Sequence, residues 1–196
     1  MMLALWLVLA VVHEPLEVLA ARLGASATWQ ASFTQRFLPA GFTTGTEEQG
    51  VFTFAQPSRL RFDYTSEPQR IFAVDGTVAR IVDEKAGSCQ AVVLSEGSWA
   101  ALPVAGLADP AGLQQLFEVR QEGQKIVLRP RKALPEVALV EVVLGRDGLP
   151  AEVAVEDAQG NHNLFRFGPW HAVPSPRAGF FTPGLPGASP CLPQKP

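Results

Sequence analysis

Hydrophobic and polar positions alternate with a period of two along most of this chain. The stretch 59–64 is the clearest case, because Leu60, Phe62 and Tyr64 are separated by charged residues only. Successive side chains of a strand point to opposite faces, so this pattern predicts a strand with one apolar face. Similar patterns predict strands at 29–37, 51–55, 71–74, 78–82, 91–94, 117–121, 125–129, 137–144, 151–156 and 163–167.

Turn residues stand between these predicted strands. Asp75-Gly76 and Glu122-Gly123 are typical of tight hairpins, and Pro57 stops one strand just before the next begins. About eleven strands in sequential hairpins predict a mainly β (α+β) fold. The architecture that we expect is an open, incomplete antiparallel β-barrel.

Two segments interrupt the period of two. Between Pro15 and Leu23 the apolar residues recur at helical spacing, which predicts a helix. The segment 99–116 is rich in Ala, Leu, Gly and Pro, and its prolines divide it into one or two short helices, with Asp109-Pro110 as a helix start. Because this segment lies between two sets of strands, we expect it to form a lid over the barrel mouth. The predicted lid residues are Leu102, Val104, Leu107 and Leu113.

Large apolar side chains dominate one face of the predicted sheet. One interpretation is an ordinary hydrophobic core. The other follows from the scarcity of helices, because a long curled sheet with about two short helices does not fill its own interior. The apolar cavity that remains is of the kind that binds lipid. We assign its wall to Phe33, Phe52, Leu60, Phe62 and Tyr64.

The composition excludes one class of partner and suggests export. The 196 residues are 47% hydrophobic and 18% charged, with a net charge of −3, and no Lys/Arg cluster is present to bind nucleic acid. Positions 3–12 form an apolar run of ten residues, which is too short to span a bilayer and fits a signal peptide. We therefore expect residues 1–12 to be a signal peptide; a buried N-terminal helix is the alternative.

Local motifs of catalysis are missing from the sequence. It contains no nucleophile elbow, phosphate loop, dinucleotide fingerprint or zinc-ligand spacing, and its three histidines are scattered. We therefore expect a binding protein that is not an enzyme and holds no metal and no cofactor. A lipid-acting enzyme whose site is assembled only in three dimensions is one alternative, and a structural envelope protein is another.

The two cysteines, Cys89 and Cys191, both lie in turn-like contexts. In an exported protein such residues can pair. A disulfide closing a loop of this length stabilises the fold by roughly 4–5 kcal/mol in the chain-entropy account. We expect this disulfide to hold the Pro-rich, irregular tail (residues 185–196) against the sheet. Two free thiols are the alternative.

A series of short motifs follows one another in a defined strand and turn context. The motifs are Ala31-Ser32-Phe33-Thr34-Gln35, Gln49-Gly50, Pro57 before Leu60-Arg61-Phe62, Asp75-Gly76, Phe117, Leu128-Arg129-Pro130, Gly145-Arg146-Asp147-Gly148, the strand 163–167, and Phe180 to Pro183. Over roughly residues 15–183 this succession resembles the periplasmic outer-membrane lipoprotein carrier (LolA-like) family.

The resemblance implies a fold, a function and partners. Residues 13–184 would form the open β-barrel with its helical lid. The cavity would hold the acyl chains of lipoproteins that an inner-membrane ABC transporter of the lipoprotein-release type delivers. An outer-membrane receptor, itself a lipoprotein, would then accept the cargo from this periplasmic and monomeric carrier. A related exported lipid-binding or lipid-sensing open barrel is the alternative.

One position departs from the family pattern. The family often carries an arginine directly before the proline equivalent to Pro57, where it hydrogen-bonds the lid closed. This chain has Gln56 there, which lacks the charge-assisted strength of a guanidinium. The latch would then be weaker at Gln56, or be provided by Arg59 or Arg61.

Overall fold

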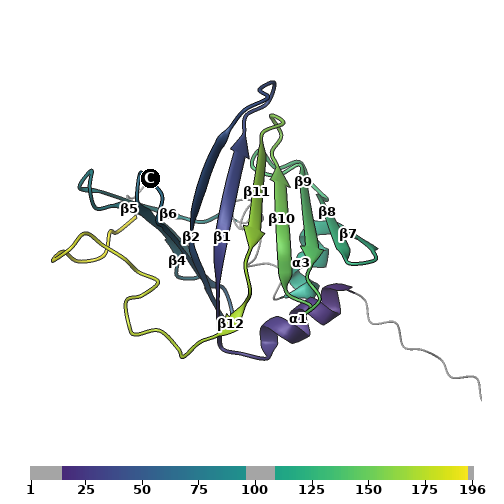
Figure 1. Cartoon of the computed structure of the whole chain (residues 1–196), viewed down its shortest axis with the longest axis horizontal. Helices are drawn as coiled ribbons and strands as arrows, with labels where there is room; N and C mark the ends of the chain where they lie inside the picture. Colours follow the sequence, from purple (N-terminus) through teal and green to yellow (C-terminus); the bar gives the residue numbers. More distant parts are fainter. Residues whose placement is uncertain (1–14, 96–108, 194–196) are drawn as a thin grey trace, which may run out of the picture.

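Antiparallel strands make up most of the computed structural model, which describes residues 15–95 and 109–193. Within these residues, twelve strands form one sheet in the order β6-β5-β4-β3-β2-β1-β11-β10-β9-β8-β7, and β12 adds to β1 (Figure 1). The elements are α1 (Pro15–Gly24), β1 (Thr28–Leu38), β2 (Thr46–Ala55), β3 (Arg59–Tyr64), β4 (Arg70–Val74), β5 (Val78–Asp83), β6 (Ser88–Val93), α3 (Pro110–Leu116), β7 (Phe117–Glu122), β8 (Lys125–Pro130), β9 (Leu139–Leu144), β10 (Pro150–Glu156), β11 (His162–Phe167) and β12 (His171–Ala172).

Strand β1 joins two antiparallel meanders. It pairs with β2 on one side and with β11 and β12 on the other. Strands β2 to β6 follow as successive hairpins, and β11 back to β7 do the same on the opposite side. In the described part of the chain, β6 and β7 lie at the two edges of the sheet and do not pair with each other. The expected open, mainly β fold is therefore confirmed.

The strand boundaries differ from the predicted ones where pairing overrides the local pattern. Strand β2 begins at Thr46 rather than at position 51, because its polar first half is held by its ladder to β1. Strand β9 begins at Leu139 rather than at position 137, after an isolated bridge between Leu134 and Val137. The two-residue strand β12 was not predicted, since a segment so short carries no alternation.

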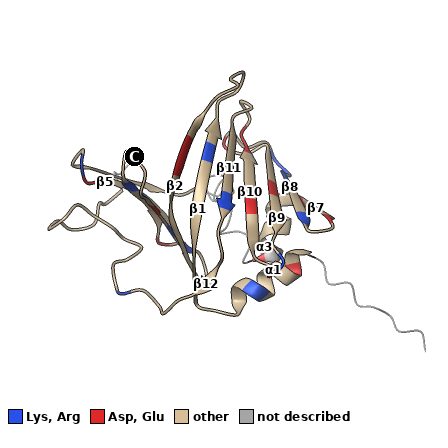
Figure 2. Cartoon of the chain, viewed as in Figure 1, with Lys and Arg blue, Asp and Glu red and all other residues tan. Residues whose placement is uncertain are grey.

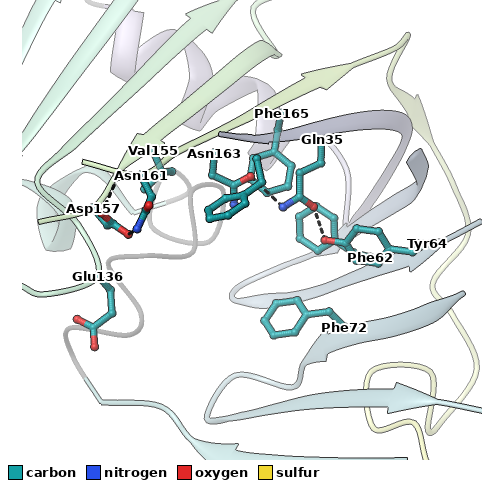
Figure 3. Close-up of a pocket in the computed structure, with 11 residues that line it drawn as sticks. Gln35, Phe62, Tyr64, Phe72, Glu136, Val155, Asp157, Asn161, Asn163 and Phe165 are labelled. Carbon is teal, nitrogen blue, oxygen red and sulfur yellow. Dashed lines mark hydrogen bonds between the residues drawn. The ribbon is translucent and has the colours of Figure 1, made fainter. Parts of the chain in front are cut away.

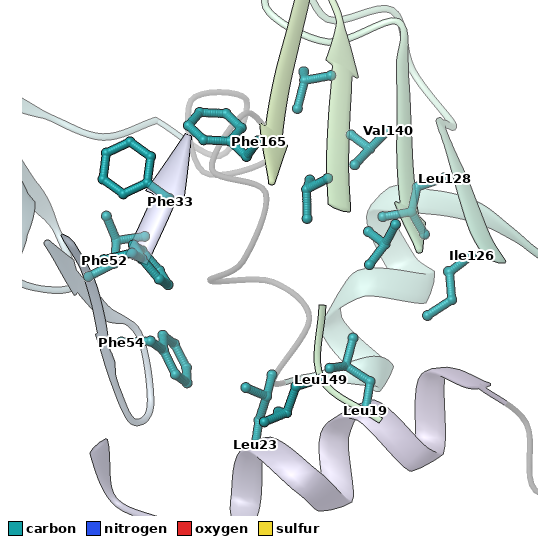
Figure 4. Packing of buried hydrophobic residues seen from close by; sticks show 14 of the residues in the cluster. Leu19, Leu23, Phe33, Phe52, Phe54, Ile126, Leu128, Val140, Leu149 and Phe165 are labelled. Atoms are coloured by element: carbon teal, nitrogen blue, oxygen red, sulfur yellow. The ribbon is translucent and has the colours of Figure 1, made fainter. Parts of the chain in front are cut away.

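Helix α1 closes one end of the curved sheet. Its buried residues Leu16, Leu19 and Leu23 recur at helical spacing, with Pro15 at its start. Figure 4 shows Leu19 and Leu23 beside Leu149, within the cluster formed by the inner side chains of the sheet. Each fully buried leucine contributes about 1.5–3 kcal/mol, so α1 is fixed mainly by its apolar face.

Helix α3 begins as its sequence predicts. The carboxylate of Asp109 accepts a hydrogen bond from the backbone N–H of Gly112 at 3.1 Å, which satisfies one of the free donors at the helix start. Leu113 is buried in the core. The other three predicted lid residues, at positions 102, 104 and 107, lie outside the described residues. None of the helices in the described part is long and apolar enough to cross a membrane.

The C-terminal segment 173–193 lies against the outer face of the β2–β6 half of the sheet (Figure 1). The Arg61 guanidinium donates to the carbonyl of Phe180 at 2.8 Å and lies 4.5 Å from the centre of its ring. Arg80, which is 5% exposed, forms an ion pair with Asp75 at 2.5 Å and donates to the carbonyl of Cys191. These arginines attach an otherwise irregular segment to the sheet.

The structure joins Cys89 of β6 and Cys191 of this segment as a disulfide, with their Cα atoms 6.0 Å apart. We predict that the double variant Cys89→Ser/Cys191→Ser unfolds at a lower denaturant concentration, by about 2–5 kcal/mol, because the unfolded chain is no longer cross-linked. Chemical denaturation measures the change, and mass spectrometry of non-reduced peptides tests the link. Two free thiols in protein purified from an oxidising compartment would contradict the pairing.

Candidate functional site

A cavity of about 320 Å³ lies between the two meanders (Figure 3). Phe62, Tyr64 and Phe72 of β3 and β4 line one side of it, and Val155 and Phe165 of β10 and β11 line the other. The cavity is therefore formed by strands that are far apart in sequence. Its volume is at the small end of the range for ligand-binding sites.

The aromatic wall of the cavity is part of a larger ring cluster. The Phe33 ring meets the rings of Phe62 and Tyr64 edge-on, at centroid distances of 5.1 and 5.2 Å. The ring centres of Phe52 and Phe62 are 4.5 Å apart. Gly50 makes room for this cluster, because a Cβ there would approach the Phe33 ring to 2.9 Å and the backbone of β3 to 2.0 Å.

The structure divides the five predicted cavity residues into two groups. Phe62 and Tyr64 line the cavity, as their alternation predicts. Phe33, Phe52 and Leu60 are at most 2% exposed and belong to the hydrophobic core beside it. The charged residues between Leu60 and Tyr64 point to the opposite face of the sheet. The wall is thus supported by packed aromatic side chains, which restrict its movement.

A row of polar side chains crosses the same cavity. The Tyr64 hydroxyl donates to Oε1 of Gln35 at 2.5 Å, and Nε2 of Gln35 donates to Oδ1 of Asn163 at 2.8 Å (Figure 3). Arg70 lies 4.0 Å from the centre of the Tyr64 ring and forms a bidentate ion pair with Glu48. The site therefore combines an apolar wall with an ordered polar border.

Burial raises the pKa of Tyr64 to about 12, and the nearby Glu48 carboxylate acts in the same direction, while Arg70 opposes it. The hydroxyl is therefore protonated at neutral pH and acts as the donor to Gln35. This order of donors and acceptors fixes the direction of the whole polar row.

Acidic groups lie at the border of the cavity. Asp157 and Glu136 both line it, and Asn161 donates to Asp157 at 2.7 Å. Burial acts to raise the pKa of Asp157, but the hydrogen bonds from Asn161, Gln159 and Gly160 outweigh it and hold that pKa below its usual value. No group of three or more His, Cys, Asp or Glu side chains suited to a metal ion occurs among residues 15–95 and 109–193.

Gln56 is bound to helix α1. Its Nε2 donates to the carbonyl of Leu23 at 2.8 Å, and the indole Nε1 of Trp29 donates to the same oxygen at 3.0 Å. This carbonyl lies in the last helical turn, where no backbone partner exists within the helix. Gln56 therefore fastens α1 to the sheet, and any contact with residues 96–108 lies outside the described residues.

Arg59 and Arg61 lie on the outer face instead. Arg59 is 5.2 Å from the centre of the Phe181 ring, and Arg61 forms a bidentate ion pair with Asp63 besides its contacts to Phe180. Arg59 also donates to the backbone carbonyl of Gln56 at 3.3 Å, but none of the described contacts of these two arginines reaches α1. Gln56 thus remains the candidate for a latch.

Several residues of the site were not identified from the sequence. Phe72, Val155, Asn163 and Phe165 all fall within predicted strands, but the pattern does not say which strands meet. Phe165 faces Gln35 across the β1–β11 ladder, a pairing between distant segments. Gln35 stands two residues after Phe33, so the period of two places this glutamine on the inner face as well.

The open sheet and its partly apolar cavity define a class of open β-barrel proteins with an internal binding site. Residues 25–183 match the family described as outer membrane lipoprotein carrier protein LolA, so the chain belongs to this family. A comparison with curated proteins found no match.

The chain is also similar to several solved structures. An uncharacterised conserved protein from Thermus thermophilus superposes with a TM-score of 0.53 at 10% identity, covering 89% of this chain and 94% of that one. A LolA superfamily protein from Nitrosomonas europaea superposes with a TM-score of 0.47 at 9% identity, and the match covers 88% of this chain and 99% of that one. A chain of the Pseudomonas aeruginosa MucA/MucB complex gives 0.46 at 17% identity, and the match covers 87% of this chain but only 60% of that one.

The unusual environment of Tyr64 leads to a pH prediction. Tyr64 is the only tyrosine, so tyrosinate absorbance reports this residue alone. We expect a midpoint at about 12 in the folded protein and 10.0 in the unfolded chain. Because the unfolded chain then loses the proton first, the free energy of unfolding should fall between pH 10 and 12 and be unaffected by Tyr64 below pH 10.

The matched control is Tyr64→Phe, which should lack both the absorbance change and this part of the alkaline loss of stability. A folded wild-type protein, verified by circular dichroism, whose tyrosine titrates at its ordinary value would show that the hydroxyl is solvated.

Proposed function

We propose that this protein is a periplasmic carrier that binds the acyl chains of lipoproteins released from the inner membrane and delivers them to an outer-membrane receptor. The observation that carries this proposal is the cavity with an aromatic wall between the two meanders of an open sheet, in a chain of the LolA family. Its partners would be acylated lipoproteins, an inner-membrane ABC transporter and an outer-membrane lipoprotein receptor. The carrier would act without catalysis.

The energetics of acyl chains suit such a carrier. Each CH₂ group removed from water contributes about 0.8 kcal/mol, so a complete chain in an apolar cavity binds tightly. The described cavity of about 320 Å³ is small, so loading would require the two meanders to separate or α1 to move. The free energy needed for this opening is recovered on release, which favours transfer to a receptor with a preformed site.

The topology permits this opening. The two meanders are connected through β1, and within the described residues their outer edges, β6 and β7, are not hydrogen-bonded to each other. Widening the cavity therefore breaks no sheet ladder in this part of the chain. The contacts of Gln56 and Trp29 with Leu23 would be among the interactions that resist movement of α1.

Charges of both signs are mixed on the surface. This arrangement is compatible with a transient contact with a partner protein rather than with an extended electrostatic interface. Figure 2 shows Lys and Arg interspersed with Asp and Glu along the strands, in keeping with a net charge of −3. Cargo affinity would therefore depend on the cavity rather than on a charged surface.

We predict that Phe62→Glu abolishes loading of an acylated peptide, because it places a carboxylate in the apolar wall at a residue that is 4% exposed. Thr34→Glu is the matched control, since it adds the same charge at an exposed position on the opposite face of the sheet. Binding is measured by fluorescence with a labelled diacylated peptide, and folding by circular dichroism. Undiminished loading of folded Phe62→Glu would exclude this face as the acyl site.

We also predict that Gln56→Arg slows cargo release or reduces uptake. A guanidinium at this position would donate a charge-assisted hydrogen bond to the Leu23 carbonyl and strengthen closure by about 1–2 kcal/mol. Gln56→Leu, which loses the donor, should have the opposite effect. Transfer of a labelled lipoprotein to its receptor compares the three forms, and equal rates would mean that position 56 is not a latch.

A further inference from the structure

We infer that the polar row of the cavity is a subsite for the carbonyl oxygen of an acyl ester or amide, with Asn163 as the hydrogen-bond donor. This inference rests on the proposed function, because it concerns the cavity assigned to the cargo chains. It goes further in naming the chemical group that is recognised. A cargo chain would be distinguished as an acyl group and not only as hydrocarbon.

The direction of the hydrogen bonds assigns the donor. Tyr64 gives its proton to Oε1 of Gln35, and Gln35 gives one from Nε2 to Oδ1 of Asn163. Both amide oxygens are thus occupied as acceptors, and the row ends at the Nδ2 amino group of Asn163. In the part of the chain that the structure describes, this amino group has no hydrogen-bond partner. A chain of this kind also polarises its terminal N–H groups, which strengthens them as donors.

The Asn163 amino group is reachable from the cavity. Asn163 is half-buried and lines the cavity together with Gln35 and Tyr64 (Figure 3). Among the described residues, no side-chain nitrogen or oxygen is both buried and without a partner, so Nδ2 of Asn163 is not sealed inside the protein. An oxygen atom of a ligand in the cavity can therefore reach it.

The charges around the cavity favour a neutral acceptor over an anionic one. The carboxylates of Asp157 and Glu136 line the same cavity and repel an anion such as a free fatty-acid carboxylate or a phosphate. Arg70, which lies 4.0 Å from the centre of the Tyr64 ring, is paired with Glu48. A neutral N–H donor in a cavity that two carboxylates also line matches the carbonyl oxygen of an ester or an amide.

The neighbouring apolar residues match the rest of an acyl group. Phe165 follows Asn163 on the inner face of β11, and its ring centre is 5.5 Å from that of Phe62. The ring centre of Phe72, on the neighbouring strand β4, is 6.2 Å from that of Phe62. A carbonyl bound at Asn163 would therefore direct its alkyl chain along these three rings.

The test compares two ligands that differ only in the carbonyl. One is a synthetic peptide whose N-terminal cysteine carries a diacylglyceryl group, and the other is the same peptide with dialkylglyceryl ether chains of equal length. We expect the wild-type protein to bind the ester about 3–10-fold more tightly, the factor for one neutral hydrogen bond.

Two variants locate the donor. Asn163→Leu should lose this preference and keep the affinity for the ether. His162→Leu, on the outer face of the same strand, should behave as wild type.

Each other outcome has a separate meaning. Equal wild-type affinities for ester and ether would overturn the subsite and leave the carrier function standing. A preference that persists in Asn163→Leu would overturn the assignment to Asn163. Absence of binding of either ligand would overturn the proposed function itself. The wild-type comparison requires no variant, and Asn163→Asp, which replaces the donor with an acceptor, serves as the second variant if Asn163→Leu does not fold.

Discussion

The ladder between β1 and β11 is the interaction on which the rest of this structure depends. It pairs Phe33 with Phe167 and Gln35 with Phe165, and it joins the N-terminal meander to the C-terminal one. Without it, each meander would expose an apolar face that neither could bury alone. Closing such a long loop costs conformational entropy, which the large shared core repays. The cavity exists because this ladder places two aromatic faces opposite each other.

The interior of the sheet is filled unevenly. At one end, α1 and its leucines complete a packed core, whereas the aromatic rings between the meanders leave a cavity. The rings that line this cavity face a space that is open to solvent, so part of their apolar surface stays in contact with water. A ligand with an apolar chain would remove that surface from water. The open edges at β6 and β7 allow the change in volume that a long chain requires.

On the outer face of the sheet, charged side chains and a disulfide hold a segment of the chain in place. The C-terminal segment lies on the β2–β6 half and is held by Arg61, Arg80 and the link between Cys89 and Cys191. These contacts stabilise the half of the sheet that carries the aromatic wall. In the proposed carrier, movement would therefore be expected in α1 and at the β7 edge rather than in this wall. Stiff walls with mobile closures allow a carrier to bind tightly and still release its cargo.

The local pattern of the chain by itself determined eleven strands and their turns, both described helix starts and the inward direction of Leu60, Phe62 and Tyr64, because these depend on neighbouring residues alone. It did not determine strand β12 or the first residues of β2 and β9, which depend on pairing with other strands. It did not determine that Phe165 and Asn163 would face Gln35, since strand pairing over such a distance is decided by the shared core and not by alternation. The same limit explains Arg59 and Arg61. Their charge and outward direction are visible in the sequence, but only the path of the C-terminal segment shows that they bind Phe181 and Phe180.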